Sequence, residues 1–67
     1  MIVRPRTYVA YRFGFSSYSV CYVHCYPQQR WEAKQAGTDG RYVELSRKGV
    51  SITIPREDFE KHWKEVG

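Results

Sequence analysis

The sequence of 67 residues predicts one small α+β domain, a mainly antiparallel sheet with a C-terminal helix packed on one face. Three observations lead to this fold class. Two segments near the N-terminus are rich in Tyr, Val and Phe, two later segments alternate apolar and polar residues, and the final segment has helical spacing. The expected order is two strands, a short helix, two strands and a helix. A small, strongly bent β-barrel with an appended helix is the alternative architecture.

The first predicted hairpin joins residues 7–13 to residues 18–26 through the turn sequence Gly-Phe-Ser-Ser at 14–17. A turn closed there pairs position 13 with 18, 11 with 20 and 9 with 22. Because side chains alternate along a strand, the two faces of the hairpin separate. One face holds Val9, Tyr11, Phe13, Tyr18, Val20, Tyr22, His24 and Tyr26, and the other holds Tyr8, Ala10, Arg12, Ser19, Cys21, Val23 and Cys25. Which of these faces is buried stays open.

Residues 27–36 are ambiguous between helix and strand. Proline at the first position, a run of good helix formers and a following glycine favour a short helix. The apolar stripe of that helix is thin, with Trp31 as its one large member. The alternation of Trp31 with Ala33 also suits an edge strand, so that assignment remains the alternative.

The second hairpin is predicted over residues 41–45 and 50–54. Its apolar residues must share one face, because a register slip of one residue would expose one of the two sets. A loop of two or four residues centred on Arg47 and Lys48 keeps those faces matched, and Gly49 can supply a left-handed position. The residues expected on the buried face are Val43, Leu45, Val50, Ile52 and Ile54.

Residues 55–66 predict the C-terminal helix. Proline occupies the first helical position, and acidic residues follow in the first turn, where they complement the helix dipole. Phe59, Trp63 and Val66 form an apolar stripe spaced to seat on a sheet.

Composition limits the function. The chain has 11 Lys and Arg against 7 Asp and Glu, a net charge of +4, and it has no room for a second domain or a deep cofactor cleft. Residues 1–50 carry 8 basic and 3 acidic side chains, a net of +5, whereas residues 51–67 carry 3 and 4, a net of −1. This asymmetry favours a partner with negative charge.

The cysteines predict free thiols in a reducing, cytoplasmic setting. Cys21 and Cys25 in one strand lie about 13 Å apart at about 3.3 Å per residue. A disulfide requires the two Cα atoms to lie within about 7 Å, so these two cysteines cannot pair with each other in such a strand. The first residues lack the apolar run of a signal peptide, and no stretch approaches the roughly 18 apolar residues of a membrane span.

No arrangement of residues indicates catalysis. Cys21, His24 and Cys25 are zinc-ligand types, but strand alternation points His24 away from the cysteines, and the spacing fails the common zinc patterns. The same alternation prevents a nucleophilic pair of Cys25 with His24. We therefore expect two buried cysteines, no metal, no cofactor and no enzyme activity.

Tyrosine beside arginine is the more informative signal. The predicted core is nearly filled without the tyrosines, so some of them should remain on the surface. Such residues stack on unpaired bases or serve as hot spots of protein interfaces. The candidate binding residues are Tyr11, Arg12, Tyr18, Tyr22, His24, Tyr26, Arg30, Trp31, Arg47 and Lys48.

Two functions follow as expectations. The first is a non-enzymatic module that docks on a larger protein or nucleoprotein complex that handles nucleic acid. The small size, the absence of an active-site arrangement and the excess of Tyr, Trp and Arg favour a module that blocks or regulates this complex. The pattern of residues from Tyr42 to Trp63 is similar to that of small hairpin-plus-helix proteins of phages and mobile elements. The alternative is direct binding of single-stranded DNA or RNA. We expect no membrane partner, and a monomer and a homodimer both remain open.

Overall fold

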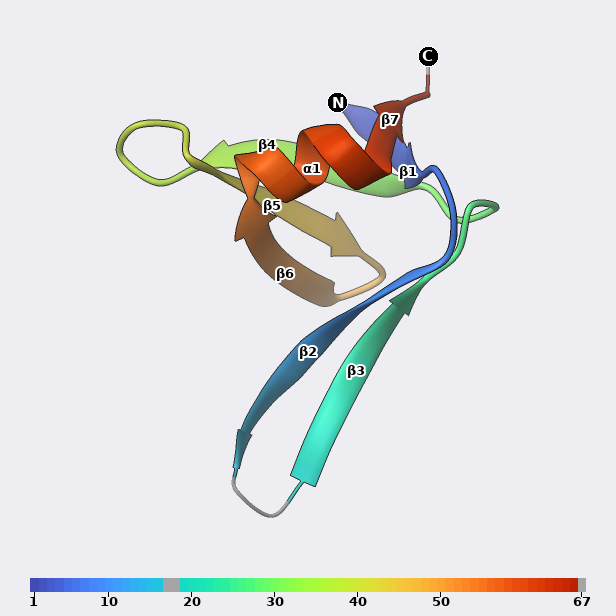
Figure 1. Cartoon of the computed structure of the whole chain (residues 1–67), viewed down its shortest axis with the longest axis vertical. Helices are drawn as coiled ribbons and strands as arrows, with labels where there is room; N and C mark the ends of the chain where they lie inside the picture. The colour runs from blue at the N-terminus through green and yellow to red at the C-terminus, as the bar shows by residue number, and fades with distance from the viewer. Residues whose placement is uncertain (17–18, 67) are drawn as a thin grey trace.

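A computed structural model describes residues 1–16 and 19–66, with the side chains of residues 1–12 and 21–66. The chain forms a five-stranded antiparallel sheet, in the order β6-β5-β4-β1-β7, and a separate two-stranded sheet of β2 and β3. The β2–β3 hairpin extends away from the larger sheet, while α1 lies across that sheet (Figure 1). The elements are β1 (Ile2–Pro5), β2 (Val9–Ser16), β3 (Ser19–Cys25), β4 (Trp31–Ala36), β5 (Tyr42–Arg47), β6 (Val50–Pro55), α1 (Arg56–His62) and β7 (Trp63–Glu65).

The α+β class is confirmed, and the barrel alternative is wrong because the five-stranded sheet stays open, with β6 and β7 at its edges. The prediction of one sheet is also corrected, since β2 and β3 pair only with each other among the described strands.

The core lies on one face of the five-stranded sheet. The indoles of Trp31 and Trp63 meet edge to face, with ring centroids 5.9 Å apart. Phe59 of α1 packs against this core from one side, and Val9, Tyr11 and Val23 of the hairpin root pack against it as well. The buried apolar residues of the core are Val3, Cys25, Trp31, Ala33, Val43, Leu45, Ile52, Ile54 and Trp63. Burial of these apolar side chains is the main force that holds the fold.

The β5–β6 hairpin confirms the shared apolar face. Val43 pairs with Ile54 and Leu45 with Ile52, and all four are buried. The turn has two residues, Lys48 and Gly49, with φ of 49° and 83°, so it is centred one residue beyond the predicted position. Two positive φ angles are those of a type I′ turn, whose twist matches that of the strands. The expected burial of Val50 is wrong, because this residue lies beside the turn and is 40% exposed.

The helix favoured for residues 27–36 is wrong. Residues 31–36 form β4, which pairs with β1 on one side and β5 on the other. Trp31 and Ala33 are buried while Glu32 and Lys34 are exposed. The strand alternative, which rested on the alternation of Trp31 with Ala33, is therefore correct, but its edge position is wrong because β4 is the central strand of the sheet. A helix here would bury one large side chain and leave the sheet without its centre.

The C-terminal helix is shorter than predicted. It covers Arg56–His62, and Trp63–Glu65 turns into β7, which pairs with β1. Trp63 is buried from a strand position, and Val66 donates its backbone N–H to the Ile2 carbonyl at 2.8 Å rather than continuing a helical stripe. Strand β1 was not predicted. Residues 63–65 pair with its edge as β7 instead of continuing the helix.

The register of the first hairpin also differs from the prediction. Position 9 pairs with 25, 11 with 23 and 13 with 21, which moves the partner of each residue by three positions. An irregularity between Phe13 and Ser16 shifts the register near the tip. A shift by an odd number exchanges the faces of β3 relative to β2. The predicted face that joined Tyr11 to Tyr22 and His24 is therefore wrong.

Candidate functional site

An exposed cluster of aromatic rings, here called the aromatic face, covers the outward side of the β2–β3 hairpin. It consists of Tyr8, Tyr22, His24 and Tyr26. The rings of Tyr8 and His24 stack with centroids 5.9 Å apart and planes 16° apart, and Tyr8 meets Tyr26 at 5.0 Å. The Tyr8 hydroxyl lies 2.5 Å from Nδ1 of His24. Tyr8, Tyr22 and Tyr26 are 48%, 54% and 40% exposed, so their rings are open to a partner.

The observed register explains why these rings face outward. Arg12 pairs with Tyr22 and Ala10 with His24, so these four side chains share one side of the hairpin. The small side chain of Ala10 leaves room above it for neighbouring rings. The opposite side is turned toward the core and is occupied by Val9, Tyr11, Val23 and Cys25.

A compact turn positions Tyr26 at the base of the aromatic face. The backbone N–H of Gln29 donates to the Tyr26 carbonyl at 2.9 Å, and the Tyr26 N–H donates to Oε1 of Gln29 at 3.1 Å. The same Oε1 accepts from Nε1 of Trp31 at 3.4 Å. Gln29 thus links the aromatic face to the core, a role that composition alone did not indicate.

Two predicted binding residues have structural roles instead. The side chain of Trp31 is only 3% exposed. Tyr11 is half-buried, and its hydroxyl accepts a hydrogen bond of 3.0 Å from Nε1 of Trp63. Burial raises the pKa of the Tyr11 hydroxyl, and the Trp63 hydrogen bond opposes that rise. Tyr18 lies outside the described residues.

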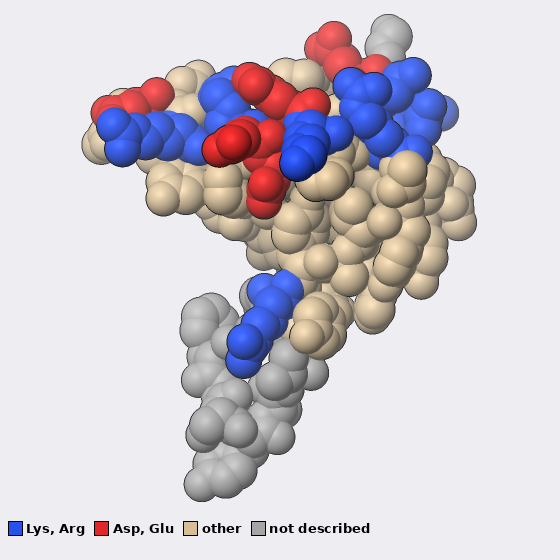
Figure 2. Space-filling model, in the orientation of Figure 1, with Lys and Arg blue, Asp and Glu red and all other residues tan. Residues whose placement is uncertain are grey.

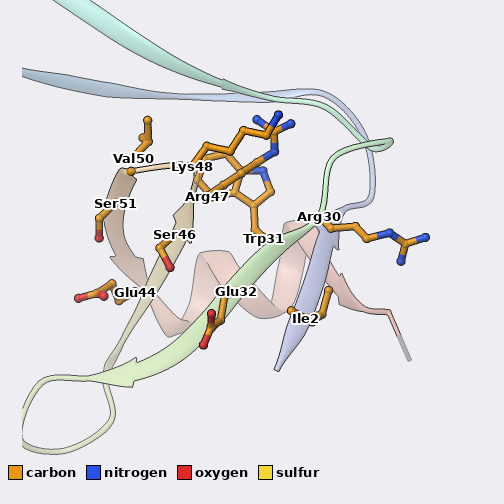
Figure 3. Close-up of a pocket in the computed structure, with 11 residues that line it drawn as sticks. Ile2, Arg30, Trp31, Glu32, Glu44, Ser46, Arg47, Lys48, Val50 and Ser51 are labelled. Carbon is orange, nitrogen blue, oxygen red and sulfur yellow. The ribbon is translucent and has the colours of Figure 1, made fainter.

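Arg30, Arg47 and Lys48 border a second surface, an open groove of about 700 Å³ beside the β5–β6 turn. Figure 3 shows Arg47 and Lys48 near Trp31 at one end of the groove, whereas the Arg30 side chain points away from them. Glu32 and Glu44 also line the groove. The mixed charges make this groove less selective for an anion than its three cations alone suggest.

A further group of positively charged residues lies outside both of these surfaces. Arg4 of β1 pairs directly with Lys64 of β7, and Arg6 follows β1. Figure 2 shows Lys and Arg atoms gathered over this end of the molecule, and Asp and Glu atoms gathered over α1. Like charges directly opposite each other in a sheet repel, and an anionic partner would relieve that repulsion. These residues were not among the predicted site residues.

The two cysteines differ, which corrects the prediction that both are buried. Both are free, but Cys21 is exposed on the hairpin and Cys25 is in the core. Burial raises the pKa of the Cys25 thiol to about 11, against a smaller lowering by Arg47. A raised pKa keeps this thiol protonated and unreactive at neutral pH.

Tyr8 is a functional candidate that the sequence analysis did not include among the binding residues. It precedes β2, and its ring reaches the outward side through contact with His24 and Tyr26. Tyr8 keeps the alternation of Ala10 and Arg12, and the shift of β3 by three positions is what brings His24 and Tyr26 to the same side as Tyr8.

The structure and the comparisons add little about chemistry. Within residues 1–16 and 19–66, no three His, Cys, Asp or Glu side chains are grouped as metal ligands require. None of the helices in the described part of the chain has the length and apolar character needed to cross a membrane. Comparison with protein-family models, curated proteins and solved structures returns no match.

Proposed function

We propose that this protein is a non-enzymatic binding module that docks through the aromatic face of its β2–β3 hairpin. The partner is a larger protein complex that handles nucleic acid, and the chain acts on it as a small regulator or inhibitor of the phage or mobile-element kind. The observation that carries the proposal is the cluster of Tyr8, Tyr22, His24 and Tyr26, exposed on a hairpin that projects from the body.

The chemistry of the aromatic face suits a protein interface. Tyrosine offers a large, rigid contact area at a low cost in side-chain entropy, and it is enriched among interface hot spots. Tyr8, His24 and Tyr26 already support one another through ring contacts, so they need little reorganisation to bind. Arg12 beside Tyr22 adds a cation for an acidic group on the partner.

Affinity capture tests the proposal. The full chain, immobilised and incubated with cell extract at physiological salt, should retain a stoichiometric protein complex. Tyr22→Ala should weaken that complex by about 1–2 kcal/mol, which is roughly 5- to 30-fold, because it removes a ring that the partner covers. The captured complex should survive nuclease treatment.

Tyr42→Ala is the matched control. Tyr42 is 47% exposed, close to the value for Tyr22, but it lies on β5 in the other sheet. Its truncation removes the same side chain from a different surface, so capture should remain within about twofold of the wild type. Equal effects of the two variants, or the absence of any complex, would refute the proposal.

Direct binding of single-stranded DNA or RNA is the second candidate. The cross-strand pair of Arg12 with exposed Tyr22 favours it, because a base can stack on the ring while the guanidinium contacts the adjacent phosphate. Fluorescence anisotropy with labelled DNA and RNA at 50 and 200 mM salt separates the two functions. On single strands each phosphate contact contributes a log–log slope of about −0.7. Tight, salt-sensitive binding weakened by Tyr22→Ala would replace the first proposal with the second.

A further inference from the structure

The two edges of the five-stranded sheet differ in how they are protected. The β7 edge has three residues, two of which, Lys64 and Glu65, are charged. The β6 edge has the sequence Val-Ser-Ile-Thr-Ile-Pro, six residues with no charge and four that are β-branched. Proteins usually guard a sheet edge with charges, bulges or short strands, because an open apolar edge pairs with other chains. Only the proline at its end guards β6.

The hydrogen-bond pattern shows what this edge presents. The Arg56 N–H donates to the Arg41 carbonyl at 2.7 Å. This bond continues the alternation in which the pairs 43–54, 45–52 and 47–50 exchange hydrogen bonds between β5 and β6. The intervening residues, Ser51 and Thr53, therefore point their N–H and C=O groups away from β5. Among the described residues, no other strand pairs with that side of β6.

A hollow lies along the same edge. It has a volume of about 360 Å³ and is lined by Ser51–Pro55 on one side and by Tyr11 and Arg12 on the other. Arg12 is the only Lys or Arg between Tyr8 and Tyr26 in the sequence, so it is the one cationic residue that the hairpin contributes to this lining. The hollow thus combines free backbone groups, apolar side chains and one cation.

We propose that the β6 edge binds an extended segment of a partner protein, which adds as a strand to the sheet and places a carboxylate beside Arg12. The backbone groups of Ser51 and Thr53 hold the segment, and the hollow between β6 and β2 receives its side chains. The charge favours an acidic segment over a second copy of this chain, since each copy carries a net charge of +4 and its own Arg12. The inference concerns the β6 edge, which shares Arg12 with the proposed function but does not depend on Tyr22 or on the other rings of the aromatic face.

The test uses a fluorescein-labelled heptapeptide of alternating threonine and valine with one central aspartate, measured by anisotropy against the full chain. A matched peptide carries lysine instead of aspartate. The aspartate peptide should bind with saturation below about 1 mM, and the lysine peptide at least threefold more weakly. Methylation of the backbone nitrogens that face β6 should weaken binding at least tenfold, a result that needs no change to the protein.

Variants of the protein test the same contacts. Thr53→Pro removes an N–H that points away from β5, which an edge strand tolerates, and it should weaken binding at least tenfold. Thr53→Val keeps the N–H and should stay within twofold. Arg12→Glu should reverse the preference between the aspartate and lysine peptides, whereas Tyr22→Ala should leave it unchanged.

Three results would overturn the inference. One is the absence of saturable peptide binding in that range. Another is binding that persists unchanged with the N-methylated peptide. The third is sedimentation showing a homodimer of the peptide-free protein that Thr53→Pro dissociates, which would make a second copy the occupant of the edge. Loss of complex capture by Tyr22→Ala with peptide binding intact would show that the two proposals stand separately.

Discussion

Replacing Tyr11 by phenylalanine should destabilise the fold by about 1–2 kcal/mol, because it removes the acceptor for a buried indole N–H. Nε1 of Trp63 donates to the Tyr11 hydroxyl at 3.0 Å, and Trp63 is only 2% exposed. The phenylalanine ring keeps the apolar contacts that the tyrosine ring makes with the core, so the change isolates the hydroxyl.

The magnitude follows from the asymmetry of hydrogen-bond energetics. A satisfied hydrogen bond contributes about 1 kcal/mol net, but a buried donor left without a partner costs about 1–3 kcal/mol. The indole of Trp63 is too buried to reach water without opening the hairpin root, while the half-buried position of Tyr11 permits some relaxation. An intermediate value of about 1–2 kcal/mol results. For a domain of this size, each kcal/mol shifts Tm by about 4–8 °C.

Urea unfolding followed by tryptophan fluorescence measures the effect. Both tryptophans are buried, so their emission reports the core. Tyr42→Phe is the control, because it removes the hydroxyl of an exposed ring and should change stability by less than about 0.5 kcal/mol. In a Trp63→Phe background, where no indole N–H exists at that position, Tyr11→Phe should cost less than about 0.5 kcal/mol. An equal cost in both backgrounds would refute the reasoning.

Three further predictions concern the cysteines and the β5–β6 turn. A chromogenic disulfide reagent should modify one thiol per native molecule, that of Cys21, and a second, that of Cys25, only on unfolding. Burial raises the pKa of the Cys25 thiol from 9.0 to about 11, so the unfolded chain loses this proton at a lower pH than the folded chain does. The free energy of unfolding should therefore fall as the pH rises between those two values. Urea unfolding at several pH values measures this fall, and Cys25→Ala should reduce it. Lys48→Asn should raise the free energy of unfolding by roughly 0.5–1 kcal/mol, measured in urea, because φ of Lys48 is 49°; an unchanged midpoint would contradict the turn assignment.

Local sequence patterns predicted the β5–β6 hairpin, whereas the structure of the two chain ends depends on contacts between residues far apart in the sequence. The apolar alternation of that hairpin and its Lys-Gly turn lie within a few residues of each other, so the local sequence is enough to predict it. Strands β1 and β7 have four and three residues and pair with each other across nearly the full chain. Residues 55–66 have good helix propensity throughout, but burial of Trp63 against β1 outweighs propensity after His62.

The sequence predicted that some tyrosines would be exposed, but it did not predict which side chains would lie together. Counting the available core residues indicated that some tyrosines would be left on the surface, and Tyr8, Tyr22, Tyr26 and Tyr42 are exposed. Their grouping depended on the hairpin register, which a turn drawn at 14–17 misplaced. Gly14 lies inside β2 near the register shift between Phe13 and Ser16. A glycine within a strand often marks a bulge, and this was the signal that could have corrected the register.

The register of the hairpin also decides how binding and stability are connected. Val9, Tyr11, Val23 and Cys25 face the core, and this anchors the root of the hairpin against the two tryptophans. Because alternation is strict, the same anchoring obliges Ala10, Arg12, Tyr22 and His24 to face solvent. A slip of one residue would bury the polar set and expose the apolar set, which the core would not tolerate. The residues that stabilise the hairpin root therefore also hold the aromatic face outward, although none of them belongs to it.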